Sequence, residues 1–151
     1  MTARHSLDEN MTATRIIISG TVDLPPERLG EALAAARPLI VGALTERGCL
    51  DYDWCPDPLH PGRIRVFERW DSESSLAEHF DGEWYRRMRD TLGSFGLIGA
   101  STAKFRVDLS ERVYDETMTP RADFFTDTTR GSVAERGAAS SSIRPTDQQS
   151  S

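Results

Sequence analysis

The run from Arg63 to Trp70 constrains the fold of this chain more than any other stretch. Side chains of a β-strand point alternately to opposite faces of a sheet. Here one face would carry Ile64, Val66, Glu68 and Trp70, and the other would carry Phe67 and three arginines. A strand of this kind belongs to a sheet with one covered face and one open face, which is typical of antiparallel sheets.

Three further stretches are predicted to be strands. The run 15–22 is rich in β-branched residues and stops at Pro25 and Pro26. The stretches 49–55 and 103–109 alternate between apolar and polar side chains. Because prolines and a glycine punctuate the interval 56–62, we expect 49–55 and 63–70 to pair as a hairpin.

An amphipathic helix is predicted between the first two strands. Pro26 suits the first turn of a helix, where its missing N–H leaves no bond unmade. Apolar residues then recur at helical spacing, at Leu29, Leu33, Ala36, Ile40 and Leu44. Pro38 falls inside this pattern, so we expect a kink or a break near Arg37, and Gly48 is a candidate for the C-terminal cap.

A second helix is predicted after the hairpin. Asp71 or Ser72 can cap its first turn, and Asp81 with Gly82 is a possible interruption. Its apolar side chains lie at successive fourth positions, which are Leu76, Phe80, Trp84, Met88 and Leu92.

The predicted order is strand, helix, strand, strand, helix, strand. This order indicates an α+β fold of the ferredoxin-like, split βαβ type (βαββαβ), with both helices on one face of an antiparallel sheet. The other face must also be covered, and a domain of about a hundred residues cannot do so alone. We therefore expect a homodimer in which two sheets face each other as a dimeric α+β barrel.

Composition changes sharply after Tyr114. The segment 115–151 is dominated by small and polar residues, and its larger apolar residues show no period. Such a segment cannot bury enough apolar surface to offset the entropy of ordering its backbone. We predict a folded domain over 12–114, a flexible N-terminus over 1–11, and a tail over 115–151 that is disordered or docked on a partner.

The charge and the distribution of apolar residues argue against several classes of partner and location. Its net charge is -6, and the sequence has no clustered basic stripe, so nucleic acid is a poor candidate. No apolar run approaches the roughly 18 residues that span a bilayer, so no membrane contact is expected. The first ten residues lack the apolar stretch of a secretory signal, which favours the cytoplasm.

Metal binding finds little support in the sequence. Cys49 and Cys55 are the only cysteines, and neither a CxxC pair nor a paired histidine motif is present. In a continuous strand these two cysteines would lie about 20 Å apart, too far to form a disulfide. We expect free thiols and no metal site.

Several motifs together resemble the antibiotic biosynthesis monooxygenase (ABM) family of dimeric α+β barrels. They are Glu46-Arg47-Gly48-Cys49-Leu50-Asp51-Tyr52, then Glu68-Arg69-Trp70-Asp71-Ser72, and then His79. The resemblance implies a quinol monooxygenase-like enzyme that needs no cofactor. Haem-degrading members carry an Asn on the first strand and a His late in the second helix, and this chain has neither.

The resemblance also places candidate site residues, and several of them have a competing structural role. His79 would accept a phenolic proton, and Tyr52 would orient a substrate oxygen, although both could simply pack at the edge of the core. The walls around a flat substrate would be Trp70, Trp84, Phe80 and Met88, although both tryptophans could simply belong to the core. Glu68 would need a cationic partner if buried, such as Arg65, Arg69 or the arginines at 86, 87 and 89. We therefore include Glu68 and Arg65 among the predicted substrate-binding residues.

Three functions remain open from the sequence. The leading hypothesis is a cofactor-independent monooxygenase that oxidises a quinol, an anthrone or a similar electron-rich phenolic compound with O2. The second is an isomerase or lyase acting on a small oxygenated metabolite, which an inward-pointing arginine such as Arg65 or Arg89 would favour. The third is a non-enzymatic dimer that binds an aromatic ligand, which a cavity filled by Trp70 and Trp84 would favour.

Overall fold

Four strands form one antiparallel sheet in the computed structural model, which describes residues 15–127. They are β1 (Arg15–Asp23), β2 (Cys49–Pro56), β3 (Arg63–Trp70) and β4 (Gly99–Val107). Their spatial order is β2-β3-β1-β4, so β2 and β4 are the edges. The predicted hairpin of β2 and β3 is confirmed. The last strand begins at Gly99, earlier than the predicted Ala103.

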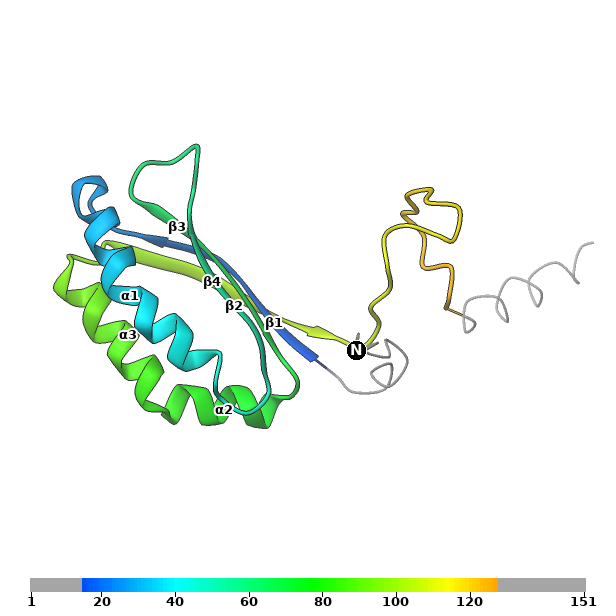
Figure 1. Cartoon of the computed structure of the whole chain (residues 1–151), viewed down its shortest axis with the longest axis horizontal. Coiled ribbons are helices and arrows are strands. Elements are labelled where there is room, and N and C mark those ends of the chain that lie inside the picture. The colour runs from blue at the N-terminus through cyan, green and yellow to red at the C-terminus, as the bar shows by residue number, and fades with distance from the viewer. Residues whose placement is uncertain (1–14, 128–151) are drawn as a thin grey trace, which may run out of the picture. The chain divides into compact units, whose positions relative to one another are not determined.

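The helical segments lie together on one face of this sheet (Figure 1). They are a short 3-10 turn η1 (Pro26–Arg28), then α1 (Leu29–Ala43), α2 (Glu73–Asp81) and α3 (Glu83–Ser94). The order of strands and helices confirms the predicted α+β, ferredoxin-like fold.

Helix α1 runs unbroken through Pro38, so the predicted break near Arg37 is wrong. Proline at this position removes the bond to the carbonyl of Ala34, four residues earlier. Both Ala34 and Pro38 are exposed, so water can satisfy that carbonyl. The buried side chains on the opposite side of the helix, Ala36 and Leu39, hold it against the core.

The second helical region is interrupted at Gly82, as predicted. Ser72 is the N-cap of α2, and its hydroxyl accepts a hydrogen bond from the backbone N–H of Ser75. Gly48 does not cap α1, which ends at Ala43. It lies in the turn before β2 with a φ of 80°, where a Cβ atom would be 2.1 Å from Ser75 Oγ.

The core lies between the helices and the face of the sheet that they cover. The face of β3 predicted to point inward is buried, from Ile64 to Trp70. Ile16, Ile18 and Val22 of β1 join it from the centre of the sheet. The helices contribute Ala32, Ala36, Leu39, Ala43, Leu76, Met88 and Leu92.

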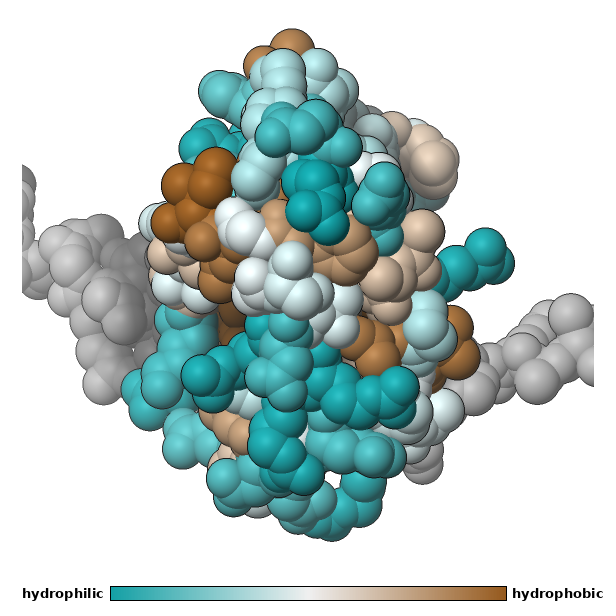
Figure 2. All heavy atoms as spheres, turned by 90° about the vertical axis from the view of Figure 1, so that its left-hand side faces the viewer, coloured by the Kyte–Doolittle hydropathy of each residue, from teal (hydrophilic) through white to brown (hydrophobic). Residues whose placement is uncertain are grey.

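The opposite face of the sheet is open and carries exposed aromatic rings. Phe67 on β3 is 38% exposed and Phe105 on β4 is 52% exposed. At one end of the domain, by contrast, hydrophobic side chains form separate small patches within a mostly hydrophilic surface (Figure 2).

A second compact unit begins at Glu111, and its described part ends at residue 127. This part of the predicted tail has local structure. Tyr114 pairs with Pro120, and one oxygen of Asp115 accepts hydrogen bonds from the backbone N–H groups of Thr117 and Thr119 at 2.9 and 3.1 Å. The predictions for 1–11 and 128–151 lie outside the described residues.

Within residues 15–127, no helix is both long and apolar enough to cross a membrane.

Candidate functional site

The alternation of β3 places an acid and an indole side by side in the core. Glu68 and Trp70 lie on the helix-facing side of the strand and are 5% and 0% exposed. The Trp70 indole Nε1 donates a hydrogen bond to Glu68 Oε2 at 3.1 Å. Glu68 therefore takes its hydrogen bond from a neutral donor on its own strand.

The predicted cationic partner of Glu68 is absent from the described residues, so that prediction is wrong. Arg65 and Arg69 lie on the other face of β3 because strand side chains alternate. Arg65 Nε donates to Asp57 Oδ2 at 2.7 Å, and Arg69 pairs with Asp51. The structure thus separates Arg65 from the other predicted site residues.

Burial raises the pKa of Glu68 to about 7. The hydrogen bond from Trp70 works in the opposite direction, and the negative charge of Glu46 adds to the increase. The charge of Glu68 therefore changes near neutral pH.

His79 on α2 is 1% exposed and is held by a carboxylate. Its Nδ1 atom lies 3.1 Å from both Oε1 and Oε2 of Glu46, in the turn between α1 and β2. A carboxylate only accepts hydrogen bonds, so Nδ1 carries the proton in this pair. In the neutral imidazole the other nitrogen, Nε2, is then an acceptor and can take up a proton.

Aromatic rings surround the imidazole of His79. The centroid distances from its ring are 4.6 Å to Trp70, 5.4 Å to Tyr52, 5.4 Å to Tyr85 and 5.9 Å to Phe80. The structure thus brings together four predicted site residues, His79, Tyr52, Trp70 and Phe80.

Sequence reasoning missed Glu46 and Tyr85 as members of this cluster. Glu46 opens the Glu-Arg-Gly-Cys-Leu-Asp-Tyr motif. An acidic side chain beside a predicted turn was a signal that could have indicated a partner for His79. Tyr85 lies beyond the break at Gly82, which removes it from the simple helical spacing of α2.

Two further groups in this region keep their protons. Burial raises the pKa of the Tyr52 hydroxyl, and the charges of Glu68 and Glu46 add to the effect. Burial also raises the pKa of the Cys49 thiol to about 12, again with a contribution from both carboxylates. Tyr52 and Cys49 are therefore neutral at physiological pH.

Trp84 and Met88 belong to the contact between helices rather than to the His79 cluster. A Cβ atom added at Gly42 of α1 would lie 2.3 Å from Cδ2 of Trp84, so the indole packs directly on the α1 backbone. Met88 is buried in the core. The structure favours the structural role for Trp84 and places Met88 in the core rather than in the lining of the pocket.

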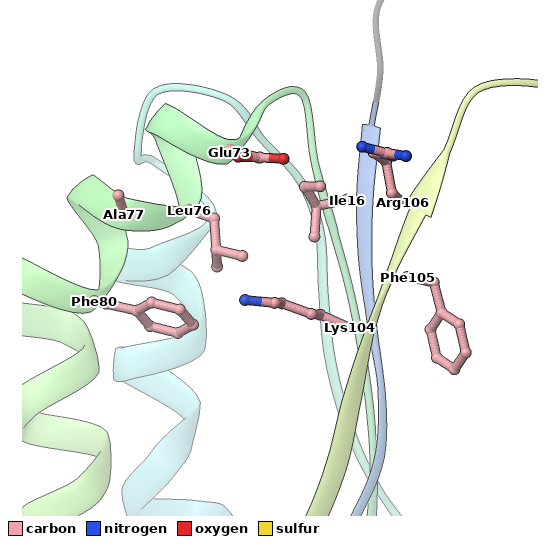
Figure 3. A pocket seen from close by; sticks show the side chains of 8 residues that line it. All are labelled: Ile16, Glu73, Leu76, Ala77, Phe80, Lys104, Phe105 and Arg106. Atoms are coloured by element: carbon pink, nitrogen blue, oxygen red, sulfur yellow. The ribbon is translucent and has the colours of Figure 1, made fainter.

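An open pocket lies beside this cluster, between α2 and the strands β1 and β4 (Figure 3). Its volume is about 520 Å³. Among the predicted site residues, all of which are described, Phe80 alone lines it. The lining residues are Ile16, Glu73, Leu76, Ala77, Phe80, Lys104, Phe105 and Arg106.

The pocket and the His79 cluster share a wall. Phe80 lines the pocket and its ring contacts His79, while Ile16 lines the pocket and pairs with Trp70 across β1 and β3. One layer of side chains therefore separates the pocket from the buried imidazole.

The chemistry of the described residues does not suggest a metal centre. Within 15–127, no three His, Cys, Asp or Glu side chains are grouped so that they could hold an ion. Cys49 and Cys55 are both free thiols.

A protein-family model matches residues 15–91 of the chain. The matching family is described as antibiotic biosynthesis monooxygenase, and the match covers about half of the chain. An uncharacterized protein of Synechocystis sp. is 24% identical over 73 residues, which are 48% of this chain and 50% of that protein. The aligned region thus spans about half the length of this curated relative.

Solved structures share the fold at low sequence identity. A proposed antibiotic biosynthesis monooxygenase from Deinococcus radiodurans has a TM-score of 0.61 at 18% identity, covering 66% of this chain and 99% of its own. A conserved protein from Methanosarcina mazei has a TM-score of 0.57 at 22% identity, covering 63% and 94%. At these identities the likeness establishes the fold alone.

Proposed function

Since the chain belongs to the antibiotic biosynthesis monooxygenase family, we propose that it is a cofactor-independent monooxygenase that oxidises an electron-rich phenolic compound, such as a quinol or an anthrone, with O2. The observation that carries this proposal is the pocket of about 520 Å³ whose Phe80 wall contacts His79, the imidazole that Glu46 holds.

The size and lining of the pocket suit a flat aromatic substrate. Small-molecule sites usually have volumes of about 300 to 1,000 Å³ and mostly apolar walls with a few polar groups. Here Ile16, Leu76, Ala77 and Phe80 supply the apolar surface. A ring packed on Leu76 and Phe80 would have water removed from the face that it turns toward these side chains.

The reaction can be balanced for an anthrone without a metal or a flavin. A base removes a proton from the CH2 group, and the resulting anion passes one electron to O2. The carbon radical and superoxide then join in a new C–O bond. The peroxide takes the proton back and eliminates water, which leaves a carbonyl group at that carbon.

We assign the proton transfer to His79. Glu46 holds Nδ1–H, which fixes the ring orientation and leaves Nε2 as the acceptor. His79 is buried behind Phe80, whose side chain is 41% exposed, so this role requires the Phe80 ring to move when substrate binds. Tyr52 keeps its proton and packs against the imidazole, and we assign it a hydrogen-bonding and positioning role.

We further propose that two copies of the chain pair through their open sheet faces. Phe67 and Phe105 are exposed there, and exposed apolar side chains on an uncovered sheet face favour an interface. This dimer would cover the face that the helices leave open.

Oxygen uptake tests the proposal. The full-length protein should consume O2 with at least one member of a panel of quinols and anthrones, in the presence of EDTA. His79→Gln should lower kcat about 100-fold or more, because general bases typically contribute that much. His60→Gln is the matched control, since His60 lies on an exposed loop. Failure of every panel member to exceed the uncatalysed rate would exclude this function.

One observation favours the second hypothesis, an isomerase or lyase. Two cationic side chains, Lys104 and Arg106, line the pocket, and cations can stabilise an enolate formed during such a reaction. The two hypotheses are distinguished by incubating the protein with small oxygenated metabolites under nitrogen. Mass spectrometry and NMR then identify any products. Turnover without O2 would support this alternative.

A further inference from the structure

We propose that this pocket binds a planar aromatic compound that carries a carboxylate or another anionic group, and that Lys104 and Arg106 select the anion. The inference rests on the proposed function for the aromatic part of the ligand and adds the charged part. None of the sequence predictions placed these two residues in a site.

The register of the sheet directs both cations toward the helices. Lys104 pairs with Ile18, and Arg106 pairs with Ile16, across β1 and β4. Ile16 and Ile18 are core residues, and paired residues of neighbouring strands point to the same face. Lys104 and Arg106 therefore lie on the helix-facing side of β4, and both line the pocket.

Neither cation is neutralised within residues 15–127. No carboxylate of this region forms an ion pair with Lys104 or Arg106. Glu73 is the one acidic lining residue, so the lining carries two positive charges and one negative charge. The whole chain has a net charge of -6, which makes a locally positive pocket unusual for this protein.

The positions of the side chains divide the pocket into an apolar and a charged part. Figure 3 shows the Lys104 amine reaching across the pocket toward Leu76 and Phe80, whereas Arg106 lies at the end near Ile16. A flat ring can pack on Leu76 and Phe80 while its anionic substituent meets the Lys104 ammonium. This arrangement would orient the ring beside Phe80, the wall that the pocket shares with His79.

β4 can carry these cations because it is an uncovered edge strand. Seven of its nine residues are exposed, including both cations. A lysine on an edge strand can also serve to prevent the strand from pairing with another sheet. That role requires a charge on the edge, but it does not predict any preference among small ligands.

Binding of a matched pair of probes tests the proposal. Naphthalene-2-carboxylate and naphthalene-2-carboxamide have nearly the same shape and differ in charge. Isothermal titration should give tighter binding of the carboxylate. This preference should weaken as salt is raised from about 20 to about 300 mM, because dissolved ions screen the attraction between exposed charges. Equal affinity for the two probes would overturn the proposal.

Substitutions locate the source of the preference. Lys104→Gln and Arg106→Gln should each weaken carboxylate binding about fivefold, because the site is open to solvent, and leave carboxamide binding unchanged. Arg37→Gln on α1 removes an exposed positive charge at a distance from the lining and is the matched control. If the three variants and the parent bound the carboxylate with the same affinity, the proposed anion site would also be overturned.

The titrations contain no oxidisable substrate, so their outcome is separate from that of the oxygen-uptake assay. A protein that prefers the carboxylate but consumes no O2 with any quinol or anthrone would retain the anion site and lose the monooxygenase function. Circular dichroism of each variant confirms that the exposed substitutions leave the fold intact.

Discussion

The Nδ1 atom of His79 lies 3.1 Å from both carboxylate oxygens of Glu46, although 33 residues separate the two in the chain. The turn after α1 supplies the acid and the second half of α2 supplies the imidazole. The carboxylate fixes which ring nitrogen carries the proton, which leaves the other nitrogen available for chemistry.

Glu46→Gln should lower kcat about tenfold and leave KM nearly unchanged. The amide can still accept a hydrogen bond from Nδ1–H, but it lacks the charge that stabilises a protonated imidazole. Glu46 does not line the pocket, so substrate binding should not depend on it. Steady-state kinetics with the best quinol or anthrone measures both constants. A rise in KM at constant kcat would contradict this positioning role.

Glu68 should make the protein less stable as pH rises. Its pKa is about 7 in the folded protein against an ordinary value of 4.5, so the folded state holds an extra proton between these values. The stability from this proton is fully present below about pH 4.5 and is lost as pH rises through about 7.

Glu68→Gln removes this dependence because the amide does not titrate. The free energy of unfolding of the variant, relative to the parent, should therefore increase by up to about 3 kcal/mol between pH 4.5 and pH 8. Urea unfolding of both proteins at the two pH values gives the difference. An equal difference at both pH values would show that Glu68 has no raised pKa.

Gly42→Ala should destabilise the protein by about 1 to 3 kcal/mol. The added methyl group would lie 2.3 Å from the Trp84 indole, which would have to move within a packed contact. Gly30→Ala in the same helix is the control, because nothing lies within 4 Å of its Cβ position. That change should be neutral or stabilising by up to about 1 kcal/mol, as measured by thermal or urea unfolding.

Phe67→Glu should convert the proposed dimer into a monomer. The substitution places a charge on the open face of the sheet, where burying it against a second copy would be costly. Leu59→Glu, on a loop where Leu59 is 79% exposed, should leave the assembly unchanged. Light scattering coupled to size exclusion gives the mass of each protein. A monomeric parent protein would exclude the dimer itself.

The fold was largely predictable because strand alternation is a local signal. The alternation of side chains from Ile64 to Trp70 indicates which face of β3 is covered, and Ser72 indicates where α2 begins. Pro38 gave the wrong prediction because its effect depends on solvent access to the carbonyl of Ala34. Solvent access depends on tertiary structure, which the sequence pattern does not contain.

The candidate site was predictable only in part. The rings of Tyr52, Trp70 and Phe80 lie around His79, but the partner of Glu68 is an indole on its own strand rather than an arginine. The cations of the pocket are Lys104 and Arg106, not Arg65. On β4 the apolar residue Phe105 points away from the helices (Figure 3), which reverses the usual relation between polarity and burial.

That reversal on β4 separates the proposed choice of ligand from the stability of the domain. Residues 104 and 106 face the helices without being packed by them, so their side chains can be exchanged at little energetic cost. A library that varies only these two positions would therefore retarget the protein to ligands of different charge on an unchanged scaffold.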